Sequence, residues 1–178
     1  EQPVDPITDV QDVVDGFPSP PRIEHAGYQA FYEPKADRVQ IAPAQRFASH
    51  ESYYATLFHE LAHATGHSTR LNRGLDEQPP PFGSPDYSKE ELIAEMGAAF
   101  LCAVAGISPA TIELSAAYID GWRRKLKDNK KLLVQAAGQG QRAADHILGV
   151  NWDESGNIVA ATAPGRDVSV QPAPIDLG

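Results

Sequence analysis

The sequence of 178 residues predicts an α+β domain in which a small N-terminal antiparallel sheet packs on a mainly helical bundle. Three short segments with the composition of strands follow one another at 22–25, 30–32 and 38–42. Apolar residues at helical spacing then recur in longer segments as far as about residue 148. Strands that precede helices, rather than alternate with them, are typical of the α+β class.

Composition and charge narrow the classes of function. Apolar residues make up 42% of the chain, as in ordinary globular domains, and no apolar run has the length of a membrane span. The net charge of −9 would repel phosphate, so we expect no direct nucleic acid binding by this segment. The single cysteine, Cys102, excludes an intrachain disulfide and favours a reducing, cytoplasmic location. Because the first residue is Glu, we expect the chain to be part of a longer protein.

Three parts of the chain are expected to differ in organisation. Residues 1–21 combine a short amphipathic helix, Pro6 to Phe17, with a turn formed by the sequence PSPP. Residues 22–150 contain the strands and the long helices, and we interpret them as a single domain. Residues 151–178 are rich in Pro, Gly, Asp and Val without a helical period, which indicates a C-terminal tail.

The strand segments are expected to roof a cleft. Pro34 and Asp37 lie between the second and third segments, as in the turn of a hairpin. Pro43 ends the third segment and favours an edge position for it, because proline cannot donate a main-chain hydrogen bond. We therefore expect an extended peptide to pair with this third strand.

The segment LFHELAHATGH at 57–67 carries the residues with the clearest chemistry. A helix from about His50 to His67, with Ser49 as its N-cap, places His59 and His63 on one face and the apolar residues on the opposite face. Two imidazoles from one rigid helix are typical ligands of a catalytic zinc ion, so we expect one Zn²⁺ per chain. Glu60 lies beside them and is predicted to be the general base. The plain alternative is an exposed helix that carries two histidines.

His67 is not expected to be the third ligand. Ligands at His59, His63 and His67 would span about 12 Å along one helix, too far for a single zinc ion. We expect His67 either to lie in the cleft or to be a polar residue at the end of the helix. The proline-rich connection at 68–87 is expected to form a wall of the cleft.

The third ligand is predicted to come from the helix at 88–106. Glu91 and Glu95 lie four residues apart on one line of this helix, and a carboxylate is a common third ligand of zinc. We predict Glu91 as ligand and Glu95 as a hydrogen-bond partner of a ligand histidine. Ser88 and Glu91 also match a capping box, and in that case Glu95 would be the ligand. Glu90 is expected to point into solvent.

Two further helices are predicted, at 108–127 and about 129–148. The first carries Tyr118, which could lie in the cleft and donate a hydrogen bond to substrate, although such a tyrosine more often belongs to the core. Gly138 and Gly140 are expected to weaken the middle of the second helix.

Several segments together resemble a known family. These segments are HAGYQAFYEPKADRVQIAP, FASHESYYATLFHELAHATGH, YSKEELIAEMGAAFL and AAYIDGWRRKL. Residues 23–150 resemble the C-terminal zincin-like metallopeptidase domain of ArdC-type antirestriction proteins, which has relatives in polyvalent proteins of plasmids and phages. The resemblance implies a gluzincin-like fold, with His59 and His63 as ligands, Glu60 as base and an acid of the Glu91–Glu95 pair as third ligand. The DNA-binding domain of that family lies upstream, and we do not extend DNA binding to this segment.

The resulting functional hypothesis is a zinc-dependent metallopeptidase that acts on a peptide or protein and belongs to an antirestriction or mobile-element protein. Zinc would activate a water molecule, and Glu60 would take its proton and deliver it to the leaving amine. The alternative is a catalytically silent binding module of the same fold that inhibits a host protein. A purely structural metal site would need four protein ligands and no base, and Glu60 argues against it.

Overall fold

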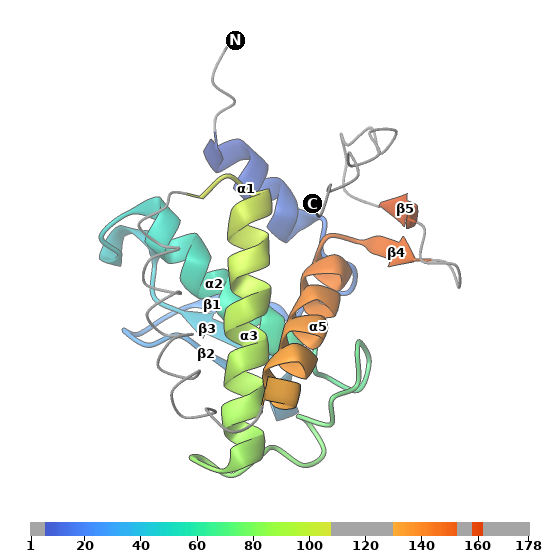
Figure 1. Ribbon diagram of the computed structural model, residues 1–178. Helices are drawn as coiled ribbons and strands as arrows, with labels where there is room; N and C mark the ends of the chain where they lie inside the picture. Colours follow the sequence, from blue (N-terminus) through green and yellow to red (C-terminus); the bar gives the residue numbers. More distant parts are fainter. Residues whose placement is uncertain (1–5, 108–129, 153–157, 162–178) are drawn as a thin grey trace.

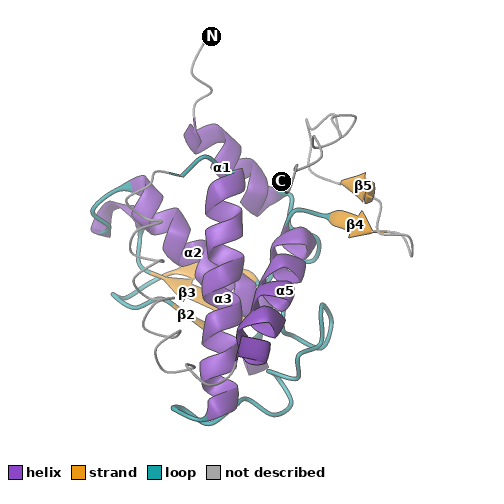
Figure 2. Cartoon of the chain, viewed as in Figure 1, coloured by secondary structure: helices purple, strands orange, loops and turns teal. Residues whose placement is uncertain are grey.

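The computed structural model describes residues 6–107, 130–152 and 158–161, and its elements confirm the α+β class. A three-stranded sheet lies behind the long helices in the view of Figure 1, and a separate two-stranded hairpin follows the last helix (Figure 2). Among the described residues, no helix is both long and apolar enough to cross a membrane. The elements in chain order are α1 (Pro6–Asp15), β1 (Arg22–His25), β2 (Phe31–Glu33), β3 (Arg38–Ile41), α2 (His50–Ala64), α3 (Pro85–Val104), α5 (Lys130–Ile147), β4 (Val150–Trp152) and β5 (Ile158–Ala161).

The three-stranded sheet is mixed, which corrects the expectation of an antiparallel sheet. Its order is β1–β3–β2, and β3 pairs antiparallel with β2 but parallel with β1, with Arg22 opposite Arg38. The segment 26–30 carries the chain from β1 past the position that β3 later fills. Such a segment can extend over roughly 17 Å, whereas two strand spacings require only about 10 Å.

The strand before α2 is central, so its expected edge position was wrong. β3 pairs on both sides, and its side chains Val39 and Ile41 are fully buried. Pro43 follows the end of the strand, where no ladder hydrogen bond is lost. The free edge beside the helices belongs instead to β2, whose residues face the cavity described below.

Helix α2 begins as predicted and ends earlier. The side chain of Ser49 accepts a hydrogen bond from the backbone N–H of Ser52 at 3.1 Å, which confirms the N-cap. The helix ends at Ala64 rather than His67 because the next residues satisfy its last carbonyl groups. The Thr65 hydroxyl donates to the Ala62 carbonyl at 2.7 Å, and Arg70 Nε donates to the Ala64 carbonyl at 2.7 Å.

Helix α3 begins earlier than predicted, and this removes the predicted capping box. Ser84 is the N-cap and accepts a hydrogen bond from the N–H of Tyr87 at 3.1 Å, and Pro85 occupies the first turn. Ser88 therefore lies inside the helix, with its own N–H bonded to the Ser84 carbonyl. Glu91 is thus free of a role in capping.

One hydrophobic core joins the sheet to four helices. Its fully buried members come from α1 (Val10, Val13), β3 (Val39, Ile41), α2 (Leu57, Phe58, Leu61), α3 (Leu101) and α5 (Ile147). The N-terminal helix therefore packs on the same core as the strands and the long helices. The division of the chain at residues 21 and 150 stays a prediction.

Helix α5 agrees with the helix predicted at about 129–148, and one of its glycines has a role that the sequence did not indicate. A Cβ atom on Gly140 would lie 2.8 Å from Met96 Cβ and 3.1 Å from the backbone nitrogen of Gly97. The two glycines therefore let α3 and α5 approach closely, as they do in Figure 2. The helix predicted at 108–127, including Tyr118, lies outside the described residues.

Two alanine substitutions in α5 are expected to have opposite effects on stability. Gly140→Ala should lower the free energy of unfolding by about 1–3 kcal/mol, because the added methyl group overpacks the contact with α3. Gly138→Ala has open space around it and should raise the free energy of unfolding by up to about 1 kcal/mol through helix propensity. Denaturant unfolding of both variants measures these changes, and equal effects would contradict the close helix contact.

Candidate metal centre

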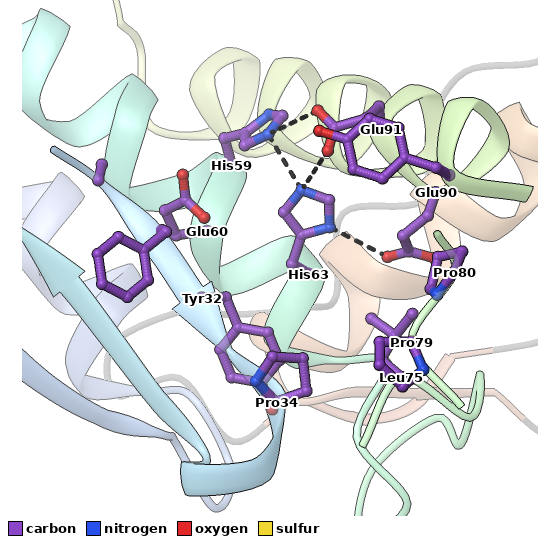
Figure 3. Close-up of a pocket in the computed structure, with 13 residues that line it drawn as sticks. Tyr32, Pro34, His59, Glu60, His63, Leu75, Pro79, Pro80, Glu90 and Glu91 are labelled. Carbon is purple, nitrogen blue, oxygen red and sulfur yellow. Dashed lines mark hydrogen bonds and ion pairs between the residues drawn. The ribbon is translucent and has the colours of Figure 1, made fainter. Parts of the chain in front are cut away.

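Helix α2 supplies three polar side chains to a cavity of about 360 Å³. Leu57, Phe58 and Leu61 are buried in the core on one face of the helix. His59, Glu60 and His63 lie on the other side and line the cavity (Figure 3). The rest of the lining comes from three places: the β2 region (Ala30, Phe31, Tyr32, Pro34), the proline-rich connection (Leu75, Pro79, Pro80) and α3 (Tyr87, Glu90, Glu91).

The donor atoms of His59, His63 and Glu91 converge in this cavity. The Nε2 atoms of the two histidines lie 3.1 Å apart, and each lies 3.6 Å from one carboxylate oxygen of Glu91. One ligand atom from each residue falls within 4.8 Å of the others. Ligands at bond lengths of 2.0–2.2 Å around a tetrahedral metal lie about 3.3 Å apart. The three side chains therefore fit a metal ion, and all three line the cavity.

Glu95 lies where a partner of a ligand histidine was predicted. Its Oε1 is 3.2 Å from His59 Nδ1, on the opposite side of the ring from Glu91. The distance is that of an ion pair, but the ring N–H is not aligned with the carboxylate, so Nδ1 has no hydrogen bond of good geometry. The assignment of Glu91 as metal ligand and Glu95 as partner of the ligand histidine His59 stays a prediction, which this geometry favours.

Glu90 was expected in solvent, and this prediction was wrong. The residue is only 7% exposed, and its Oε1 lies 3.2 Å from His63 Nδ1. Helix α3 is buried on two sides, against α2 and α5, so its polar face is narrower than that of a surface helix. The spacing of Glu90 with Ile93, Ala94 and Gly97, all buried, marks a second buried face and was the signal that could have identified it.

Burial and neighbouring charges alter the pKa values of the site. Burial raises the pKa of Glu60, and the nearby His59 and His63 only partly offset this effect. Burial would also raise the pKa of Glu91, but the two histidines hold it below its ordinary value. For His59 burial lowers the pKa, yet the Glu91 and Glu95 carboxylates raise it to about 10. The site thus favours a positive charge between the imidazoles and Glu91, and gives Glu60 a raised affinity for a proton.

Glu60 lies beside the sheet, apart from the carboxylates of α3. It is 8% exposed and lies on the side of the cavity that faces β2 (Figure 3). A hydrogen bond with the backbone of Tyr32, a residue of β2, lowers its pKa and so favours the ionised form. Glu60 does not belong to the group of converging donor atoms, which agrees with its prediction as a base rather than a ligand.

The proline-rich connection forms one wall of the cavity, as expected. Leu75, Pro79 and Pro80 line it opposite β2, and Figure 3 shows them across the cavity from Tyr32. His67 lies in the turn after α2, with Nδ1 at 2.8 Å from the Thr69 hydroxyl and Nε2 at 3.5 Å from Asp76. It is not among the described residues that line the cavity, and Tyr118 lies outside the described residues.

The chain is similar to several known proteins. A protein-family model described as a zincin-like metallopeptidase matches residues 18–139. A DNA primase TraC from Escherichia coli is 38% identical over 123 residues, which cover 69% of this chain and 8% of TraC. The uncharacterized protein y4eC from Sinorhizobium fredii is 35% identical over 141 residues, which cover 79% of this chain and 45% of y4eC. The chain thus spans less than half the length of these curated relatives.

Solved structures of an antirestriction protein share the fold. The Mn(II)-bound structure of ArdC from the R388 plasmid has a TM-score of 0.60 and 36% identity, and covers 79% of this chain and 51% of ArdC. The metal-free structure of the same protein has a TM-score of 0.59, with 36% identity over 81% of this chain and 49% of ArdC. These findings confirm the resemblance to ArdC-type antirestriction proteins and the zincin-like fold expected from the sequence.

Two substitutions in α3 are expected to distinguish the metal ligand, Glu91, from Glu95, which contacts the ligand histidine His59. Glu91→Gln removes a charged donor and should weaken zinc binding by more than about 100-fold, whereas Glu95→Gln should weaken it by about 10-fold to 100-fold. Competition with a chromophoric chelator measures both affinities. If Glu95→Gln had the larger effect, the roles of the two carboxylates would be exchanged.

Proposed function

Because this chain belongs to the zincin-like metallopeptidase family, we propose that it is a zinc-dependent metallopeptidase domain that hydrolyses peptide bonds with water. One observation carries this proposal. Three donor atoms converge on a point in an open cavity, and the buried carboxylate of Glu60 lines that same cavity without joining them. A structural metal site needs four protein ligands and has no use for a fifth, separate acid.

Zinc is the metal that we propose for the site. Two imidazoles and one carboxylate form a common ligand set of catalytic zinc, in which the fourth position stays open. ArdC from R388, the relative of known structure, was found with Mn(II), and borderline ligand sets of this kind accept several divalent ions. His59, His63 and Glu91 would hold the ion in this chain. When bound, the ion supplies Lewis acidity, which lowers the pKa of water and polarises a carbonyl group.

Glu60 is the proposed general base. Burial raises its pKa above the ordinary value of a carboxylate, which strengthens it as a proton acceptor. A hydrogen bond with the backbone of Tyr32 acts in the opposite direction and lowers its pKa, and Glu60 is not one of the three converging donors. Glu60 would take a proton from the attacking water and deliver it to the nitrogen of the leaving amine. In this scheme the Nε2 atoms of His59 and His63 would bind the ion, while their Nδ1 atoms face Glu95 and Glu90.

The shape of the cavity supports an extended peptide as substrate. β2 is an edge strand of the sheet and lines the cavity with Phe31 and Tyr32. Leu75, Pro79 and Pro80 lie on the opposite side and offer apolar contact. A peptide between these walls could pair with the main chain of β2 beyond Tyr32, which is the role that was first predicted for the third strand.

A second candidate function is a catalytically silent module that binds a host protein. Its support is the similarity to ArdC, an antirestriction protein that was also solved without metal and retains the same likeness to this chain. The chain covers about half of ArdC, so an antirestriction or mobile-element role belongs to a proposal about the whole protein. A binder and an enzyme would share the fold and the metal ligands and differ only in turnover.

Replacement of Glu60 is expected to separate these two functions. Glu60→Gln keeps the shape of the side chain but cannot accept a proton, so it should lower cleavage of a peptide library by about 100-fold to 10,000-fold. Zinc content, measured by mass spectrometry, should stay at about one ion per chain in the parent and the variant. The matched control is Glu77→Gln, which removes an exposed carboxylate outside the cavity and should cleave like the parent.

Each result decides between the candidates. Cleavage by the parent and loss of cleavage in Glu60→Gln, at equal zinc content, would establish the peptidase and its base. Zinc binding without any cleavage by the parent would favour the silent module. Equal cleavage by the parent and Glu60→Gln would remove Glu60 from the mechanism.

A further inference from the structure

We propose that Arg73 and Glu90 form a positioning pair that orients the metal ligand His63 and ties it to the proline-rich wall of the cavity. The inference rests on the proposed metal centre but not on peptidase activity. It assigns a role to two residues that neither ligate the metal nor act as base. It also predicts that movement of the wall and binding of the metal are linked.

The contact between Glu90 and His63 has the geometry of a ligand support. Glu90 Oε1 lies 3.2 Å from His63 Nδ1, while His63 Nε2 lies 3.1 Å from His59 Nε2 and 3.6 Å from Glu91. An N–H at Nδ1 that donates to Glu90 leaves the lone pair of Nε2 directed at the donor cluster. Carboxylates in this position orient a ligand histidine and increase its basicity.

Arg73 holds the carboxylate of Glu90 with a bidentate contact. Its Nη2 donates to Glu90 Oε1 at 2.6 Å, and its Nε donates to Glu90 Oε2 at 2.9 Å. Both side chains are nearly excluded from solvent, at 12% and 9% exposure. The planar fork of a guanidinium fixes both oxygens of a carboxylate, which a lysine at the same position could not do.

The same guanidinium is fastened to the end of α2. Arg73 Nη2 donates to the carbonyl of Ala62 at 2.9 Å, and Nη1 donates to the hydroxyl of Thr65 at 2.8 Å. These acceptors flank His63 in the sequence. One cation therefore holds both the helix end around His63 and the carboxylate that contacts its ring, so the partner of the imidazole is fixed relative to α2.

Arg73 belongs to the segment that becomes the wall of the cavity. Its backbone N–H donates to the carbonyl of Gly66 at 2.9 Å, and Leu75 nearby lines the cavity. A Cβ atom on Gly66 would lie 2.5 Å from Leu75 Cδ1 and 3.0 Å from Arg73 Nη2. A side chain at this position would force Leu75 to shift away from α2. The wall is thus connected to the metal ligand by direct contacts. Arg73, two residues before Leu75 in the wall, contacts Glu90, and Glu90 contacts His63.

The plain alternative is that the pair only anchors the wall. Buried ion pairs are weak evidence for stability, because their desolvation cost offsets much of their attraction. The chain offers a matched control, since Asp76 anchors the same wall without touching a ligand. Its Oδ1 accepts from the N–H of Ser68 at 3.0 Å, and its Oδ2 accepts from the Ser68 hydroxyl at 2.5 Å. Asp76 is also 3.5 Å from His67, which does not line the cavity.

The test is the affinity for zinc, measured by competition with a chromophoric chelator, in the parent, Glu90→Gln, Arg73→Met and the double variant. Each single substitution should weaken zinc binding by about 10-fold to 100-fold. The zinc affinity of the double variant should lie within a few fold of that of the weaker-binding single variant, because both substitutions act through one contact. Asp76→Asn should bind zinc within a few fold of the parent. Arg73→Lys should fall between the parent and Arg73→Met, because it keeps the charge and loses the fork.

A second readout separates positioning from loss of folding. Co²⁺ loaded in place of zinc gives a visible absorption spectrum that depends on the orientation of its ligands, and this spectrum should change in Glu90→Gln and stay unchanged in Asp76→Asn. Circular dichroism of the metal-free variants identifies any that fail to fold. If Arg73→Met fails to fold, the zinc affinity of Arg73→Lys is compared with that of the parent instead.

The outcomes have distinct meanings. Unchanged zinc affinity and Co²⁺ spectrum in Glu90→Gln and Arg73→Met would overturn the positioning role while leaving the metal centre intact. Equal weakening by Asp76→Asn would overturn it in favour of a general effect of wall order. A parent chain that binds no zinc would overturn both the metal centre and this inference. Absence of cleavage by a parent that binds zinc would affect the proposed peptidase alone.

Discussion

The packing of α2 against α3 constrains the rest of the structure, because these two helices bury ionisable side chains on the faces they share. Near the middle of the interface the contact is made by small residues, and a Cβ atom on Gly97 would lie 3.1 Å from Ala62 Cβ. Beside this close approach, His59 and His63 meet the carboxylates of α3. Removing each charge from water costs several kcal/mol unless it is paired. Each imidazole of α2 therefore lies beside carboxylates of α3, and these paired side chains form the candidate metal centre.

The topology of the sheet supplies what the two helices lack. Because β3 lies between β1 and β2, β2 becomes the edge strand beside α2. Its residue Tyr32 offers a backbone partner to Glu60, so this buried carboxylate of α2 lies against the sheet, apart from the acids of α3. An antiparallel meander in chain order would have placed β2 in the centre and β3 at the edge. The mixed order is thus what brings the proposed base and the cavity to the same strand.

The sequence predicted those parts of the site that depend on local geometry. His59, Glu60 and His63 lie on one helix, so spacing alone placed them together, and Ser49 identified the start of that helix. Strand pairing, the burial of Glu90 and the contact at Gly140 depend on elements distant in sequence, and a periodic pattern carries no information on these. Glu91 was ambiguous because Ser88 offered a local alternative, which the true start of α3 at Pro85 removes. Arg73 was not identified, since its partners lie on two helices that flank it in sequence.

The proposed ligands lie on two helices that pack directly against each other, α2 and α3. The Mn(II)-bound and metal-free structures of ArdC resemble this chain equally well, with TM-scores of 0.60 and 0.59. In this interface Glu91 and Glu95 raise the pKa of His59 to about 10, so this imidazole carries positive charge beside the two acids. The elements that carry these side chains share one hydrophobic core, formed by α1, α2, α3, α5 and the sheet. Helix packing therefore sets the positions of the donor atoms that we propose as metal ligands.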